Sequence, residues 1–108
     1  MVSLETFSAL DIRIGKIVNA EEHEKARKPM YKLTVDFGSS IGTRTIIAGI
    51  RDQYGKDELL GKKVACIINL EPKIIAGVES QGMMLAAGEE KISVLVPERE
   101  VDEGSRVH

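Results

Sequence analysis

The chain has 108 residues, of which 43% are hydrophobic and 30% charged, and its formal net charge is −2. This length suits one domain over residues 1–108 with a single core and is too short for two. No apolar run approaches the roughly 20 residues of a membrane span, and the first residues lack the pattern of a secretory signal, so we expect a cytoplasmic protein.

The charge is unevenly distributed along the chain. Residues 11–80 contain 12 Lys or Arg against 10 Asp or Glu, whereas residues 81–108 contain 3 against 6. Domains dedicated to nucleic acid are commonly basic, so the net charge argues mildly against that class. Because the acid excess lies in the tail, the remainder can still bind phosphates with modest, salt-sensitive affinity.

The first elements are a short helix and a strand. Residues 3–10 predict a helical turn with Ser3 as its N-cap, which we expect to cover one open end of the core. Residues 11–20 predict a strand whose apolar residues change phase at Gly15. A glycine at such a change predicts a bulge or a sharp bend.

Residues 21–29 form a charged loop in which three cations gather: Lys25, Arg27 and Lys28, here called the basic loop. These side chains could bind phosphate. A charge run is usually only a solvated surface, and glutamates lie beside this one, so that alternative stays open and is slightly favoured.

A second and a third strand follow. Residues 30–37 alternate cleanly between apolar and polar side chains, and the pattern points four of them toward a core: Tyr31, Leu33, Val35 and Phe37. After a turn at 38–42, β-branched residues predict another strand over 43–50.

The second half of the chain predicts one helical turn and three more strands: 51–61 as the turn, then strands over 62–70, 83–87 and 91–96. Gly61 is a natural C-terminal cap for the helical turn. Cys66, the one cysteine, lies in the apolar run of the next strand, where we expect a small buried thiol rather than a nucleophile.

Three strands, a short helix and two strands are the order of an OB-fold, a five-stranded Greek-key barrel of the all-β class. OB-folds bind oligonucleotides on the face of strands two and three and with the loops that join strands one to two and four to five. Here those features are a face carrying Lys32 and Arg44, the basic loop, and the stretch 69–85. They converge on one predicted surface.

The stretch 69–85 mixes Pro72, Gly77 and Gly82 with polar residues between two apolar segments. Pro72 fixes its own φ and the glycines permit left-handed geometry, which predicts a structured loop able to present polar groups to a ligand. The alternative is an ordinary strand connection in which the glycines serve only the turns.

This stretch also carries a resemblance. Asn69-Leu70-x-Pro72 followed by Ala76-Gly77-Val78-x-Ser80-x-Gly82-Met83 resembles the tRNA-binding domain family, which includes free-standing tRNA-binding proteins, C-terminal domains of methionyl-tRNA synthetases and CsaA-like chaperones. The similarity extends upstream through three further segments: 11–17, 32–38 and 61–64. It covers nearly the whole chain in order.

The resemblance implies tRNA contacts for four residues, with Lys73 nearby: Lys32, Asn69, Ser80 and Met83. The lysines can neutralise phosphates, the amide and the hydroxyl can bond sugar or phosphate oxygens, and Met83 offers a soft apolar contact. Structural alternatives stay open: Asn69 could satisfy loop backbone, Ser80 could cap a turn, and Met83 could belong to the core.

Glu71 departs from the family pattern, in which a basic residue is frequent around this position, and Ala76 likewise offers no charge. Aromatic residues are scarce, and the two in the second strand are assigned inward, so recognition of the folded shape of tRNA fits better than base stacking. His23 and His108 lack partners at metal or nucleophile spacing, so we expect no catalytic or metal site, no cofactor and no enzyme activity.

Residues 91–108 exceed what a five-stranded barrel requires. The resemblance implies a symmetric homodimer through this extension, with four valines as its apolar seam: Val94, Val96, Val101 and Val107. Alternatively, the segment only closes the barrel. The functional prediction is a tRNA-binding module that assists a methionyl-tRNA synthetase catalytic chain in trans. An export chaperone that binds unfolded peptides and a purely structural dimerisation unit are the alternatives.

Overall fold

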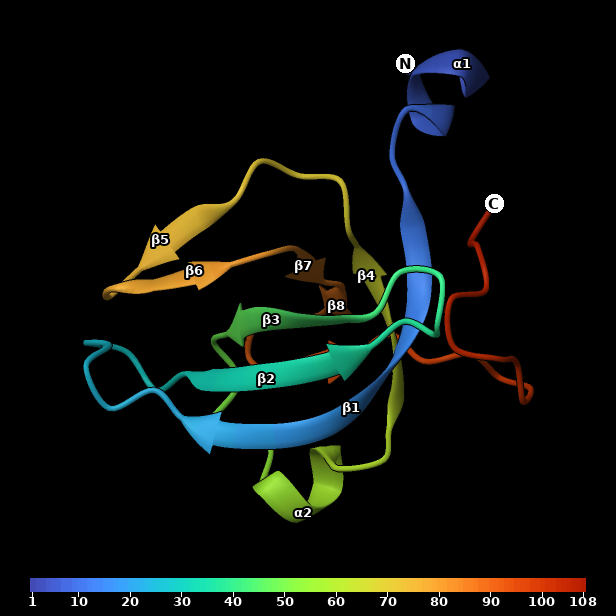
Figure 1. Cartoon of the computed structure of the whole chain (residues 1–108). Coiled ribbons are helices and arrows are strands. Elements are labelled where there is room, and N and C mark those ends of the chain that lie inside the picture. Colours follow the sequence, from blue (N-terminus) through green and yellow to red (C-terminus); the bar gives the residue numbers. More distant parts are fainter.

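A curved sheet of five antiparallel strands forms the body of the protein, in the order β3-β2-β1-β4-β7 (Figure 1). The computed structural model describes residues 1–108. Its elements are α1 (Leu4–Ser8), β1 (Ile12–Glu22), β2 (Tyr31–Asp36), β3 (Thr43–Ala48), α2 (Lys56–Leu59), β4 (Lys63–Ile67), β5 (Lys73–Ile75), β6 (Val78–Ser80), β7 (Met83–Met84), β8 (Ala86–Ala87) and β9 (Ser93–Val94). No helix has the length and apolar character to cross a membrane.

The sheet closes into a barrel where the chain enters β7. The Gln81 N–H donates to the Thr45 carbonyl of β3 at 2.8 Å, and the Thr45 N–H donates back to Gln81 Oε1 at 2.9 Å. With α2 between β3 and β4, this is the predicted OB-fold, and the all-β expectation is confirmed.

β1 pairs with β2 on one side and with β4 on the other. A bulge does occur in this strand, but its predicted position at Gly15 is wrong, because the ladder shifts between Ile17 and Asn19. Gly15 serves close packing instead, since a Cβ there would lie 2.5 Å from Val35 Cγ1. The bulge allows both Ile17 and Ala20, three residues apart, to join the same core.

Two apolar clusters lie on opposite faces of β1. The larger contains 14 buried residues inside the barrel, among them the four residues of the second strand that alternation pointed inward. The smaller lies on the outer face of β1 and β4 and consists of Ile12, Ile14, Ala65 and Ile67. Alternating side chains of one strand therefore feed both clusters.

The C-terminal segment covers the smaller cluster. Val101 and Val107 pack against it, and the Val107 N–H donates to the Ile12 carbonyl at 2.8 Å. Val94 is 5% exposed and belongs to the barrel interior, so only Val96 of the four predicted seam valines remains largely exposed. Three of the four are therefore used inside this chain.

α1 begins as predicted, because the Ser3 hydroxyl accepts the Thr6 N–H at 3.0 Å. The expectation that it covers an end of the core is wrong: every residue of α1 is exposed, and Figure 1 shows the helix beyond the N-terminal end of β1. Asn69 holds the junction, where its side chain accepts the Asp11 N–H at 2.8 Å and donates to the Ala9 carbonyl at 2.7 Å.

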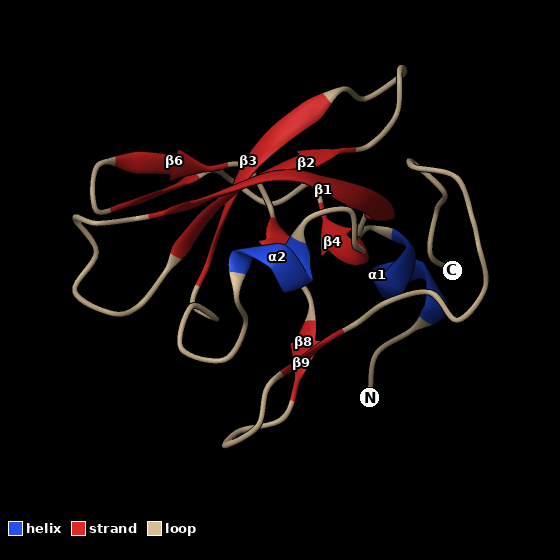
Figure 2. Ribbon diagram, turned by 90° about the horizontal axis from the view of Figure 1, so that it is seen from below, coloured by secondary structure: helices blue, strands red, loops and turns tan.

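The stretch 69–85 is structured and contains the β5–β6 hairpin, and Gly77 lies in the hairpin turn, so both predicted alternatives stay open. Ala76 and Gly77 form its turn with φ of 48° and 85°, the two positive values of a type I′ turn. The strand predicted over 83–87 is divided: β7 joins the main sheet, whereas β8 pairs with β9 away from it (Figure 2).

Candidate nucleic-acid interface

The loop between β1 and β2 lies against the tip of the β5–β6 hairpin. His23 is buried at the start of this loop, and its Nε2 lies 2.8 Å from the carbonyl oxygen of Ile75, 52 residues later. Since a carbonyl can only accept, Nε2 carries the proton and donates. The His23 N–H also donates to the Met30 carbonyl at 2.9 Å. His23 thus joins both ends of the loop to the hairpin.

The basic loop extends into solvent at this junction. Lys25, Arg27 and Lys28 are exposed, and none of them forms an ion pair with a carboxylate. Lys73, on the hairpin, is likewise exposed and unpaired. Four of the predicted cations are therefore available for phosphate without losing an existing partner.

Lys32 differs from these cations because it already has a partner. Its Nζ lies 3.3 Å from Glu21 Oε2 across the β1–β2 ladder. The hydrogen bond from Lys32 holds the pKa of the Glu21 carboxyl below its ordinary value. A phosphate that binds Lys32 must compete with this carboxylate.

Arg44 does not share a face with Lys32, and this part of the prediction is wrong. In the β2–β3 register Lys32 lies opposite Ile47, while Arg44 lies opposite Val35, whose side chain is fully buried. Residues opposite each other share a face, so Arg44 lies on the inner side at the barrel end. Its Nη1 donates to the Ile68 carbonyl.

Three other candidates are placed apart from the basic loop or are already bonded. Ser80 is 5% exposed, and its hydroxyl accepts the Ile47 N–H at 3.0 Å and donates to the Gly82 carbonyl at 3.1 Å. Asn69 binds backbone at the start of β1, as described above. Met83 is half-exposed opposite Ile67, on the outer face of the barrel. The side chains of Ser80 and Asn69 therefore do bond backbone groups, as the structural alternatives for these two residues stated.

Sequence reasoning missed His23, which it treated as a lone loop histidine. The partner of His23 is a main-chain carbonyl, and any residue type supplies one. No side-chain pattern could therefore have indicated the contact. The same holds for Ser80, whose two partners are backbone groups.

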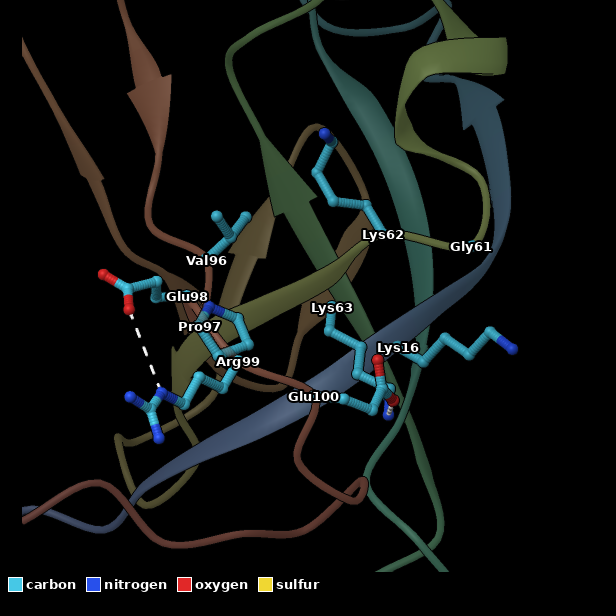
Figure 3. A pocket seen from close by; sticks show the side chains of 9 residues that line it. All are labelled: Lys16, Gly61, Lys62, Lys63, Val96, Pro97, Glu98, Arg99 and Glu100. Carbon is cyan, nitrogen blue, oxygen red and sulfur yellow. Dashed lines mark hydrogen bonds and ion pairs between the residues drawn. The ribbon is translucent and has the colours of Figure 1, made fainter.

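A polar cavity of about 390 Å³ lies elsewhere, between the start of β4 and the C-terminal segment (Figure 3). Lys63 donates there to the Glu100 carboxylate and to the Val101 carbonyl. The hydrogen bond between Lys63 and Glu100 lowers the pKa of Glu100 and raises the pKa of Lys63. Lys16 and Lys62 point away from each other (Figure 3). The cavity is an ion-paired anchor for the C-terminal segment rather than a convergent anion site.

The groups with catalytic or metal-binding chemistry do not gather. No set of three or more His, Cys, Asp or Glu side chains has a spacing suited to a metal ion. Cys66 is fully buried, as expected, and burial raises the pKa of its thiol to about 12. A thiol of this kind stays protonated at neutral pH and is a poor nucleophile.

Comparison with known proteins agrees with this geometry. The family described as "Putative tRNA binding domain" matches residues 12–106. The chain is 49% identical over 107 residues to a methionine–tRNA ligase of Pyrococcus furiosus, covering 98% of this chain and 14% of that protein. It is 52% identical over 107 residues to the Methanoculleus marisnigri ligase, covering 99% and 16%. The chain thus spans about a seventh of these relatives.

Solved structures match over the whole chain. The CsaA chaperone protein from Picrophilus torridus has a TM-score of 0.94 at 35% identity and covers 100% of both chains. The MetRS-related protein from Pyrococcus horikoshii has a TM-score of 0.90 at 38% identity, covering 100% of this chain and 98% of its own. From the family match, the ligase relatives and these structures, the chain belongs to the tRNA-binding domain family.

Proposed function

We propose that the chain is a non-catalytic, structure-specific tRNA-binding module, formed by one domain over residues 1–108 and acting in the cytoplasm. The observation that carries the proposal is the unpaired basic loop held beside the β5–β6 hairpin by His23. In this proposal the basic loop, Lys32 and Lys73 contact phosphates, while Asn69 and Ser80 support the surface from within. RNA contacts by Met83 and Arg44 stay predictions.

The test is the salt dependence of binding to folded tRNA. Removing two phosphate contacts in Lys25→Ala/Lys28→Ala should weaken binding and reduce the slope of log affinity against log salt by about 1.5. The matched control is Lys16→Ala/Lys62→Ala, which removes the same charge from two lysines that also form no ion pair and line the other cavity. Equal effects of the two double variants would show that tRNA binding depends only on the net charge of the protein. Absence of tRNA binding at low salt would refute the proposal.

Assistance to a methionyl-tRNA synthetase in trans is the finer part of the proposal. It is supported by the ligase relatives, of which this chain matches 14–16%. Added to a synthetase catalytic chain that lacks such a module, the protein should lower KM for tRNA and leave kcat unchanged, because it adds binding away from the reacting atoms. Unchanged KM together with intact tRNA binding would reject this role.

We also propose a homodimer that uses residues 91–108. Leu95 and Val96 of this segment are exposed apolar side chains, 42% and 52%, as are Leu4 and Phe7 of α1. The test is the mass measured by sedimentation equilibrium, with Val96→Glu as the variant and Val18→Glu, at another exposed valine, as the control. A monomeric mass for the unmodified chain at micromolar concentration would exclude the dimer.

A second candidate function is favoured by one observation. The CsaA chaperone matches all of this chain at a TM-score of 0.94, so a chaperone that binds unfolded peptides fits the same scaffold. Competition distinguishes the two: an unfolded peptide that displaces tRNA and binds more tightly than tRNA at physiological salt would favour the chaperone. Failure of both ligands to bind would favour the third alternative, a structural dimerisation unit.

A further inference from the structure

The basic loop and the hairpin tip enclose an open groove of about 480 Å³ between them. Its apolar walls are Ala26 and Met30 from the β1–β2 loop and Ile75 and Ala76 from the hairpin. The hydrogen bond from His23 to the Ile75 carbonyl sets the distance between these walls, and it is the one hydrogen bond that joins the loop to the hairpin. The groove therefore exists because two distant segments are fixed together.

The electrostatics of the groove select the sign of a ligand. The three cations of the basic loop line it together with the apolar walls, and no carboxylate does. A neighbouring depression of about 260 Å³ shares Lys25 and Ala76 with the groove and also carries Glu22 and Glu24. The groove, lined by three cations and no carboxylate, therefore attracts anionic ligands more strongly than the depression, where two carboxylates accompany one lysine.

Ala76 gives a second, independent observation. Its φ of 48° lies in the left-handed region, where alanine is disfavoured and glycine or asparagine is common. Such strain is typical of positions where function selects the side chain. A methyl group at this position keeps the hairpin wall of the groove apolar and leaves its mouth open.

We propose that this groove binds one unpaired nucleotide of an RNA, with the base against Met30, Ile75 and Ala76 and its flanking phosphates on the basic loop. The inference rests on the proposed RNA-binding function and deepens it. An unstacked nucleotide combines a flat apolar face with adjacent negative charge, which matches apolar walls rimmed by cations. Met30 supplies an adaptable contact of the kind that a methionine makes with a ring.

The experiment compares a blunt RNA duplex with the same duplex carrying one bulged nucleotide. Unmodified protein should bind the bulged duplex about fivefold more tightly, which is the lower end of the range for a base stacked on an aromatic ring, because the walls here are aliphatic. Ala76→Asn fills the groove and Ala76→Gly widens it, and both residues accept the positive φ. We expect Ala76→Asn to lose the preference while keeping its affinity for the blunt duplex, and Ala76→Gly to retain the preference.

Photocrosslinking gives a direct second readout. A 4-thiouridine at the bulge should crosslink within residues 25–30 or 75–76. The proposal is overturned if tRNA binds but the bulge confers no preference, if the preference survives in Ala76→Asn, or if crosslinks map elsewhere. Occupation of the groove by an acidic apolar peptide instead of bulged RNA would also overturn it. Failure of every RNA to bind, tRNA included, would refute the proposed function itself.

Discussion

Cations on the proposed binding side of the barrel differ in whether a carboxylate already pairs with them. Lys32 is held by Glu21 at 3.3 Å, whereas the cations of the basic loop have no such partner. An exposed ion pair of this kind contributes little, because solvent screens it. Glu21 should therefore weaken, without preventing, the phosphate contact proposed for Lys32.

Replacing this carboxylate should strengthen RNA binding. Glu21→Gln frees the Lys32 ammonium, and we expect tRNA affinity to rise by roughly twofold to fivefold at low salt, with less gain at high salt. Filter binding or fluorescence anisotropy measures the change. Glu79→Gln, an unpaired carboxylate on the hairpin, is the control, because an equal gain there would assign the effect to net charge.

Cys66 makes stability depend on pH in the alkaline range. Its thiol pKa is raised from 9.0 to about 12 by burial, so the folded state keeps a proton that the unfolded state loses above pH 9. The contribution is complete below pH 9 and disappears as pH rises toward 12, with a limiting slope of about 1.4 kcal/mol per pH unit. Urea unfolding at pH 8, 9 and 10 under reducing conditions measures this decline.

The matched variant is Cys66→Ala, which removes the titrating group. It should be less stable than the unmodified protein at pH 8, because it leaves a small cavity, and the difference should narrow at pH 10. Parallel pH dependence of the two proteins would show that the buried thiol does not cause the decline.

At the scale of elements, α1 is connected to the barrel by the side chain of Asn69, which bonds both sides of the α1–β1 junction, and by Arg106, which donates to the Ser8 carbonyl at 3.3 Å. Asn69→Ala removes two hydrogen bonds at the α1–β1 junction, of 2.8 and 2.7 Å. We expect a loss of about 1–2 kcal/mol in stability and faster proteolysis before residue 11, because a freed terminus is more accessible. Asn19→Ala, at an exposed position of β1, is the control. Unchanged cleavage would mean that other contacts hold α1.

Sequence predicted some elements well and others poorly, for physical reasons. Strict alternation identifies β2 because one of its faces is buried and the other is wet. The β1 bulge was predicted at the wrong residue because Gly15 is required by close packing against Val35, a residue on the neighbouring strand. The hairpin was predicted only as a structured loop, since an Ala-Gly turn lacks the usual asparagine or glycine at its first position.

At the scale of the whole molecule, side chains as well as backbone close the barrel. Ser80 satisfies the Ile47 N–H, and Gln81 satisfies that of Thr45. Ser80→Ala leaves the first donor unpaired in a partly buried position, and we expect a loss of about 1–3 kcal/mol by urea unfolding. If Ser80→Ala instead weakened tRNA binding while stability stayed unchanged, the hydroxyl would contact RNA directly.

The candidate site was predictable in part. The sequence identified the basic loop and the stretch 69–85 as two loops of one OB-fold surface, and the structure places these two side by side through His23. It could not predict that Arg44 lies inward, because register with β2 decides its face. Nor could composition reveal that the side chains of Ser80 and Asn69 form hydrogen bonds with backbone groups.

The place of β1 between β2 and β4 has a consequence for folding time. The β1–β2–β3 ladder uses one continuous stretch, residues 12–48, joined by short loops, and needs nothing further along the chain. The β1–β4 ladder and the junction of residue 45 with residue 81 require distant segments to meet. Because closing long loops slows folding, a nascent chain can form the three-stranded meander first, and barrel closure then sets the slower phase, on the millisecond to second scale of non-local β pairing.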